Sequence, residues 1–187
     1  MNTTPSLSQS LSTAILPLVL AVLTILFGQG MGIVFGLNED AIKRRLSAAA
    51  AEVRGTVYNS DAAAIKTVLD KSWVYMQRAH LHAGGMGTTA LVLILLLCLL
   101  GASQRVTVAI GVGLGAGGFG YSLYWMWAGF RAPALGSTGA AKESLKWLAM
   151  PSSGAFVVAT VAVLVLVIVT CVRRRRAASP QMAAANP

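Results

Sequence analysis

The chain's two histidines, His80 and His82, lie where a polar segment gives way to a long apolar run. Imidazole can ligate iron or copper, and it can exchange a hydrogen bond with a quinone headgroup. Residues two apart on an α-helix point about 200° apart, so both imidazoles cannot reach one centre while the helix is regular. We therefore expect His80 to face the helix bundle and His82 to face away from it.

Sulfur and polar side chains accompany the histidines. Met76 shares the helix face of His80, and thioethers suit Cu(I). Haem, quinone and copper are therefore the candidate cofactors, beside a purely structural hydrogen bond between helices. A haem held by histidines of two helices is disfavoured, because no other segment carries a histidine. The candidate cofactor-binding residues are His80, His82, Met76, Gln29, Tyr121 and Arg131, and the candidate metal ligands are His80, His82 and Met86.

Membrane-spanning helices are expected to position these side chains. The sequence is 56% hydrophobic and 11% charged, whereas soluble domains carry about 25% charged residues. Apolar blocks long enough to span a bilayer occupy about 13–36, 79–101, 106–129 and 152–172. The prediction is an all-α, polytopic membrane protein. Its four transmembrane helices form one antiparallel bundle, a single membrane domain over residues 1–187.

Amphipathic helices are expected outside the membrane, on one side of the bundle. The segment 37–78 begins with Asn38 and two acidic residues, as helices often do. Within it, Asn59, Ser60 and Asp61 are expected to end one helix and cap the next, which runs from about Asp61 into the second span.

A second, shorter loop helix is predicted over about 138–149. Ser137 or Thr138 would cap it, and Pro151 would stop it. The small-residue tail 177–187 is expected to be disordered.

Glycines recur at four-residue intervals in the first and third spans. They allow another helix to approach to backbone distance, either within the bundle or on a partner or a second copy of the chain. Gln29, a polar residue beside the first set, is expected to form a hydrogen bond between helices. The sets are Gly28, Gly32 and Gly36, then Gly111 with Gly115 and Gly113 with Gly117.

The net charge of +9 is explained in part by the run Arg173 to Arg176, directly after the last span. Such a run anchors topology and meets anionic lipid headgroups. No basic patch interleaved with aromatic residues occurs outside the spans, so a nucleic-acid partner is not expected. We expect both termini in the cytoplasm, although the loop side carries more Lys and Arg.

Three short strings carry a resemblance. RAHLHAGG at the entry to the second span, NEDAIK after the first and GSTGAAKE before the last resemble small, uncharacterised four-span proteins of the bacterial inner membrane. RAHLHAGG is also similar to the histidine-bearing helix entrance of haem-copper-oxidase-related membrane proteins. The other histidines of that family are missing here, so its catalysis is not carried over. The resemblance implies an association with haem or with respiration.

Two functions from different classes are therefore expected. The first is a small cofactor-binding subunit of a respiratory or redox complex. The alternative is a non-catalytic membrane module that packs on a partner protein, or on itself, through the glycines. The spans lack acidic residues, which argues against a coupled transporter, and no nucleophile lies near an acid and a base, which argues against a hydrolase.

Overall fold

The computed structural model describes residues 7–184, with side chains as far as Arg176. Within that range all the regular structure is helical, and no strand occurs. Four of the helices, α2, α3, α4 and α6, are long and apolar enough to cross a membrane. The predicted all-α fold with four spans is confirmed. The helices are α1 (Leu7–Thr13), α2 (Ile15–Glu52), α3 (Ala62–Leu100), α4 (Gln104–Leu135), α5 (Thr138–Glu143) and α6 (Lys146–Ala184).

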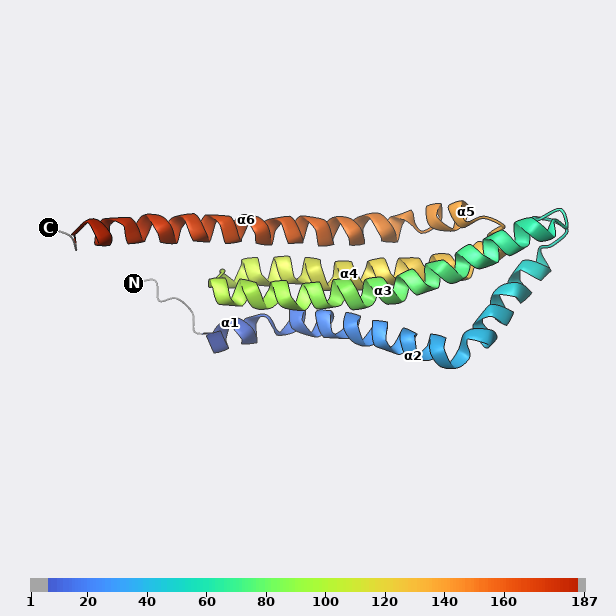
Figure 1. Ribbon diagram of the computed structural model, residues 1–187, viewed down its shortest axis with the longest axis horizontal. Coiled ribbons are helices and arrows are strands. Elements are labelled where there is room, and N and C mark those ends of the chain that lie inside the picture. The colour runs from blue at the N-terminus through green and yellow to red at the C-terminus, as the bar shows by residue number, and fades with distance from the viewer. Residues whose placement is uncertain (1–6, 185–187) are drawn as a thin grey trace.

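Helix α4 is the centre of the bundle. It packs on α2, α3 and α6, whereas α6 makes nearly all its helix contacts with α4. Successive long helices run antiparallel, so the loop between α2 and α3 and the short helix α5 share one end (Figure 1). We call this the loop end. The bundle is thus a three-helix unit with α6 attached along one side of α4.

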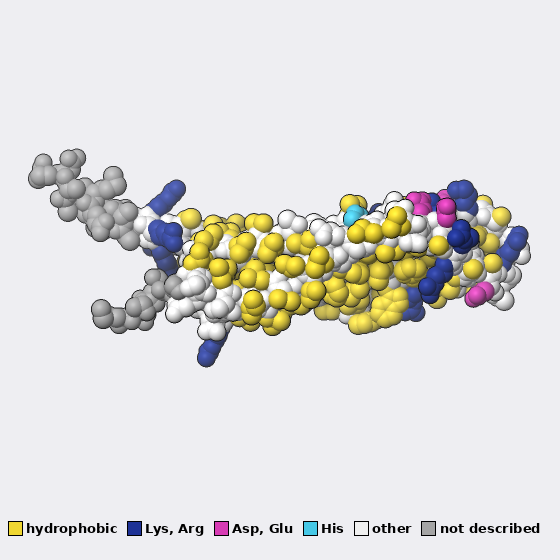
Figure 2. Space-filling model, turned by 90° about the horizontal axis from the view of Figure 1, so that it is seen from below, with side chains coloured by type: hydrophobic (Ala, Val, Ile, Leu, Met, Phe, Trp, Pro, Cys, Tyr) yellow, Lys and Arg dark blue, Asp and Glu magenta, His cyan; other side chains and the backbone are white. Residues whose placement is uncertain are grey.

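The surface matches a multi-pass membrane protein. Hydrophobic side chains cover the middle of the molecule, and Lys and Arg lie at both ends (Figure 2). The acidic side chains in this view are all at the loop end. An uncharged belt between two charged ends is what a bilayer requires of the helices that cross it.

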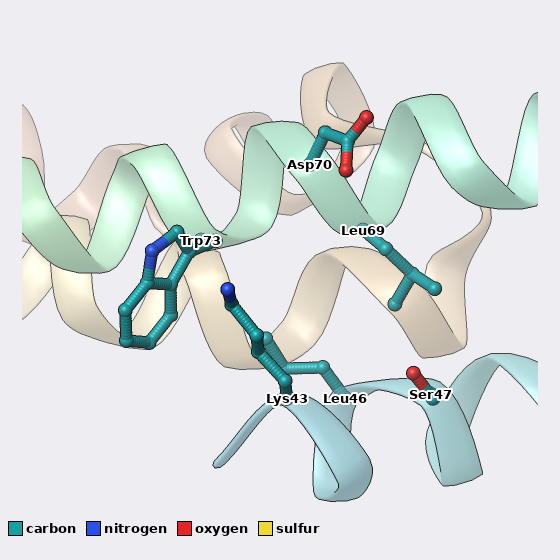
Figure 3. Close-up of a pocket in the computed structure, with 6 residues that line it drawn as sticks. All are labelled: Lys43, Leu46, Ser47, Leu69, Asp70 and Trp73. Atoms are coloured by element: carbon teal, nitrogen blue, oxygen red, sulfur yellow. The ribbon is translucent and has the colours of Figure 1, made fainter. Parts of the chain in front are cut away.

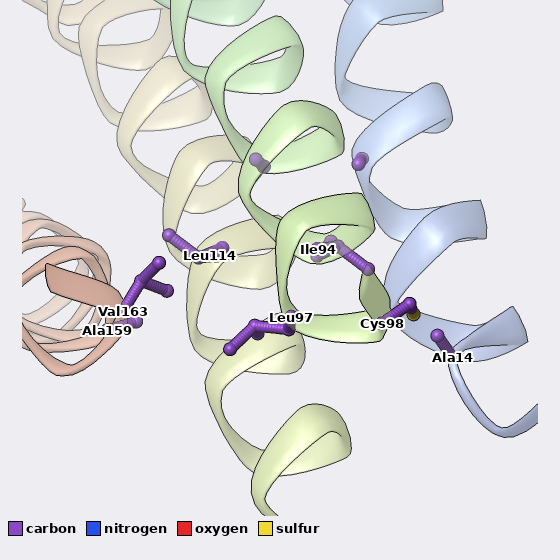
Figure 4. Close-up of a cluster of buried hydrophobic side chains, with 9 residues drawn as sticks. Ala14, Ile94, Leu97, Cys98, Leu114, Ala159 and Val163 are labelled. Atoms are coloured by element: carbon purple, nitrogen blue, oxygen red, sulfur yellow. The ribbon is translucent and has the colours of Figure 1, made fainter. Parts of the chain in front are cut away.

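Two clusters of buried apolar side chains hold the spans together. In the half away from the loop end, Ile94 and Leu97 of α3 meet Leu114 of α4 and Val163 of α6 (Figure 4). The other cluster lies toward the loop end and is richer in aromatic rings. One half of the bundle is therefore aliphatic, and the other contains the candidate site.

Glycines on α4 bring its backbone against two different helices. A Cβ atom at Gly117 would stand 2.7 Å from the carbonyl oxygen of Ser152 in α6. One at Gly115 would stand 2.7 Å from the Cβ of Leu20 in α2. Gly111 meets Pro17 of α2 in the same way. These small residues therefore lie at contacts between helices of the same chain.

Helix α2 changes direction where the sequence predicts a helix start. Asn38 has φ −129° and ψ 22°, so α2 bends there, and its second half leads to the loop end (Figure 1). Asn59 and Ser60 adopt positive φ and reverse the chain. The carboxylate of Asp61 then accepts hydrogen bonds from the N–H groups of Ala63 and Ala64, which confirms it as the cap of α3.

A buried tyrosine fastens this loop to the end of α4. Tyr58 is 5% exposed, and its hydroxyl donates a hydrogen bond to the carbonyl oxygen of Pro133 at 2.7 Å. Burial raises the pKa of the Tyr58 phenol, so it stays protonated and able to donate. The loop between α2 and α3 is thereby held on the spans.

The second loop helix and the tail differ from the prediction. Ser137 does cap α5, but α5 ends at Glu143, and α6 begins at Lys146 and continues through Pro151. Pro151 lies near the start of α6, where its missing N–H removes one backbone hydrogen bond without ending the helix. The helix α6 extends to Ala184, so most of the tail 177–187 is helical. Residues 185–187 lie outside the described residues.

We predict that Gly117→Leu lowers the melting temperature of the purified protein by about 5 °C or more, as overpacking costs about 1–3 kcal/mol. The new side chain would collide with the backbone of α6. Gly154→Leu is the matched control, since no atom lies within 4 Å of a Cβ at Gly154. Equal melting temperatures for the two variants would contradict this account of the α4–α6 contact.

We predict that Tyr58→Phe destabilises the protein by about 1 kcal/mol, because it leaves the carbonyl of Pro133 without its donor while keeping the ring. Chemical denaturation in detergent measures this difference. Thr56→Val, which removes an exposed hydroxyl nearby, should change stability far less.

Candidate functional site

His80 ties α3 to α2. Its Nδ1 lies 2.8 Å from the carbonyl oxygen of Gly28, and since a carbonyl can only accept, Nδ1 carries the proton and donates. The rest of the ring also faces α2: a Cβ atom at Gly32 would stand 2.9 Å from Cε1 and 3.6 Å from Nε2. The imidazole therefore fills the space between the two helices. That position fits a structural hydrogen bond between α2 and α3.

His82 packs on α4. Its ring is stacked on that of Tyr121, with centroids 5.1 Å apart and an angle of 22° between the planes. The expectation that His82 faces away from the bundle is wrong, because α3 has α2 on one side and α4 on the other. Neither nitrogen of His82 forms a hydrogen bond with another described residue, and the side chain is half-buried.

Five rings from two helices form what we call the aromatic cluster. Tyr121 is stacked at 5.7 Å on Tyr124, extending the stack that begins at His82. Trp125 meets Tyr75 edge to face at 4.9 Å. Edge-to-face and offset pairs of this kind are favourable beyond their buried area. The cluster comprises Tyr75 and His82 of α3 with Tyr121, Tyr124 and Trp125 of α4.

The indole N–H of Trp125 has no hydrogen-bond partner. The side chain is 9% exposed, and Nε1 is the one buried side-chain nitrogen or oxygen in the described part of the chain without a partner. A buried donor left unpaired costs about 1–3 kcal/mol. The cluster thus holds a strong donor surrounded by rings, which are weak acceptors.

Two cations border the aromatic cluster. The guanidinium of Arg78 lies 5.0 Å from the ring centroid of Trp125 and 5.6 Å from that of Tyr75. Lys142, from α5, lies 5.9 Å from Tyr75. Neither cation pairs with a carboxylate in the ion pairs of the described residues. The cluster therefore presents positive charge and N–H donors, with no carboxylate among its members.

The structure brings only two of the predicted cofactor-binding residues together, His82 and Tyr121. Met76 is buried and lines an apolar hollow beside α2, and Gln29 is exposed. Gln29 takes part in none of the hydrogen bonds between described residues, so its expected interhelical bond is not formed. Arg131 is half-buried near the end of α4 and is absent from the aromatic cluster.

The predicted metal ligands are divided between two faces of α3. His80 lies against α2, whereas His82 and Met86, four residues apart, both face α4, at Tyr121 and Gly118. No group of three or more His, Cys, Asp or Glu side chains suited to a metal occurs among the described residues. The geometry offers stacking surfaces and hydrogen-bond donors in place of a gathered set of ligands.

Sequence spacing could have found part of the aromatic cluster. Tyr75, Arg78 and His82 lie three and four residues apart, so they share a face of α3. On α4, Tyr124 and Trp125 lie three and four residues after Tyr121, so both lie near it on one face. The sequence spacing does not predict that Lys142 lies near the cluster, because Lys142 is on α5, which approaches Tyr75 only through tertiary packing.

A separate hollow lies between the second half of α2 and α3. Its volume is about 370 Å³, and its charged residues are already paired: Lys43 with Glu39, and Asp70 with Lys66 at 2.7 Å. Figure 3 shows Lys43 extended toward Trp73, whose ring centroid is 5.2 Å from Nζ. Because Lys43 and Asp70 already form ion pairs within the chain, they are less available to bind a charged ligand in this hollow.

We predict that Gly32→Ala and His80→Ala are non-additive in a double-mutant cycle. A Cβ at Gly32 would displace the imidazole, and this collision disappears once the imidazole is removed. The coupling free energy should be about 1 kcal/mol. Gly36→Ala, with no atom within 4 Å of its Cβ, should show no coupling to His80→Ala, and equal coupling for both glycines would contradict this placement of His80.

Comparison with known proteins does not assign the site. No protein-family model matches the chain, and neither the curated proteins nor the solved structures include a significant match. The geometry of the described residues is therefore the basis for a function.

Proposed function

We propose that the protein is a small, non-catalytic membrane subunit that binds the headgroup of a quinone at the aromatic cluster. The observation that carries the proposal is the stack of His82 on Tyr121, beside buried Trp125; neither imidazole nitrogen nor the indole N–H has a hydrogen-bond partner among the described residues. Its setting is a respiratory or redox complex of the bacterial inner membrane, with both termini in the cytoplasm.

The chemistry of a quinone fits these groups. Its headgroup is planar and apolar on its faces, and each carbonyl oxygen accepts hydrogen bonds. The stack of His82, Tyr121 and Tyr124 supplies an aromatic surface, and the imidazole, the indole of Trp125 and the guanidinium of Arg78 supply donors. Donors of this kind suit a ligand that only accepts, and the nearby carboxylate, Glu143 of α5, is not a member of the cluster.

The depth of the aromatic cluster also supports a quinone. Its residues lie at the loop end of the spans, where tyrosine and tryptophan mark the level of the lipid headgroups. A quinone carries its polar ring at this level while its isoprenoid tail remains among the lipid chains. A freely soluble ligand would have no need of such a position.

Haem and copper receive less support from the same geometry. His80 donates to Gly28 and lies against α2, so it does not join His82 and Met86, which face α4, in one set of ligands. The alternative of a packing module is also weaker, because the glycines at Gly111, Gly115 and Gly117 already contact helices of the same chain. A partner would have to use other surfaces, such as the outer face of α6, which is largely exposed.

The test is to purify the protein in mild detergent and measure its absorption spectrum, its metal content and the quinone released by organic solvent. We expect near-stoichiometric quinone with no Soret band. Tyr121→Leu should reduce the quinone retained at least about threefold, the loss expected from one aromatic contact.

Phe119→Leu is the matched control for Tyr121→Leu. It removes a ring two residues earlier on α4, where Phe119 meets Phe27 of α2 at 5.3 Å and belongs to no part of the aromatic cluster. Its quinone content should equal that of the unmodified protein. A Soret band would favour the haem hypothesis instead, and a colourless protein without metal or quinone would return attention to the packing module.

A further inference from the structure

Phe130 stands where three hollows meet, on a side of α4 that contains no residue of the aromatic cluster. One hollow, of about 350 Å³, lies between α2 and α4. A second, of about 440 Å³, lies between α4 and α6. The third, of about 280 Å³, lies beside the second half of α2. Phe130 lines all three, and Met126 lines the first two.

The two larger hollows suit hydrocarbon. Phe27 and Met31 line the first, and Leu123 and Trp147 line the second; the remaining walls are apolar side chains and one glycine. From Phe130, at the loop end, the first hollow extends along α2 as far as Phe27 and the second along α4 as far as Leu123. The side chains of Met126 and Phe130, which we call the ridge, separate the two hollows. Two acyl chains could therefore lie side by side, one on each side of the ridge.

The third hollow adds a positive charge directly above this ridge. The guanidinium of Arg45 lies 5.7 Å from the ring centroid of Phe130 and lines the hollow with it. Arg45 is exposed and pairs with no carboxylate in the ion pairs of the described residues. It follows the bend at Asn38, which places it at headgroup level beyond the end of the first span.

Two tryptophans mark the same level. Trp127 and Trp147 meet edge to face at 6.2 Å, and both line the hollow between α4 and α6. Their rings are 45% and 64% exposed, as expected of indoles at the boundary between hydrocarbon and headgroups.

We propose that this surface binds an anionic, two-chain phospholipid. The phosphate lies at Arg45, and one acyl chain enters each of the apolar hollows on either side of Met126 and Phe130. An unpaired cation above two apolar channels complements one negative charge above two chains. A quinone, with one tail and no charge, would leave both Arg45 and one channel unused.

The test uses protein reconstituted with equal amounts of phosphatidylglycerol and phosphatidylcholine, with the lipids that stay bound counted by native mass spectrometry. We expect phosphatidylglycerol to be retained in preference. Arg45→Ala should reduce its retention about fivefold, the effect of one basic residue at a membrane surface. Arg44→Ala removes the same charge one residue away, at a hollow by the bend, and should retain the lipid.

The acyl-chain half of the proposal has its own variant. Gly30 lines the hollow between α2 and α4, and no atom lies within 4 Å of a Cβ there, so Gly30→Leu fills the channel without a collision. It should reduce phosphatidylglycerol retention, whereas Gly154→Leu, equally open but outside the hollows, should not.

Three results would overturn the proposal: equal retention of the two lipids, equal losses for Arg44→Ala and Arg45→Ala, or normal retention by Gly30→Leu. Quinone content, measured on the same samples, should stay unchanged in Arg45→Ala and Gly30→Leu. These measurements therefore test the lipid proposal and the quinone proposal independently.

Discussion

The close approach of α4 to its neighbours is the constraint on which the rest of this structure depends. Apolar side chains gain nothing by leaving lipid for another helix, so spans associate through tight packing and a few polar contacts. At Gly115 and Gly117 the α4 backbone comes so near to α2 and α6 that a single added carbon would collide with them. This spacing fixes the distance between helices, and with it the width of every space between their side chains.

Two different environments result on α4. Toward α3 the approach continues with Gly129, where a Cβ atom would stand 2.9 Å from the carbonyl oxygen of Ser72. The neighbouring large rings, Trp125 and Tyr75, are consequently pressed together, and an indole N–H is enclosed without an oxygen to bind. Between α2 and α6, which do not pack on each other, α4 is uncovered and its side chains leave hollows. One helix therefore carries a crowded polar-aromatic face and an open apolar one.

Much of this fold could be predicted from the sequence, because the bilayer imposes long apolar blocks that are easy to recognise. The cap at Asp61, the bend at Asn38 and the left-handed glycine Gly101 that ends α3 are local signals and were predictable too. The predictions that were wrong depend on where a residue lies within its helix or in the tertiary structure. Pro151 indicates a helix end by its chemistry, yet α6 continues through it because only one hydrogen bond is lost near its start.

The candidate site was less predictable for a related reason. The spacing of His80 and His82 shows that they point in different directions, but not that each direction meets a helix. That depends on which helices pack on the two sides of α3, and no local sequence pattern specifies these neighbours. Likewise, the exposure of Gln29 and the arrival of Lys142 at the rings follow from tertiary packing.

The attachment of α6 mainly through α4 bears on the order of membrane insertion. Chains are made from the N-terminus, so α2, α3 and α4 can complete their mutual contacts before α6 has been synthesised. The aromatic rings of α3 and α4 are then already assembled, and α6 is added to a finished surface. The last span is thus added to rings that are already assembled, and its Val163 then completes the aliphatic cluster in the other half of the bundle.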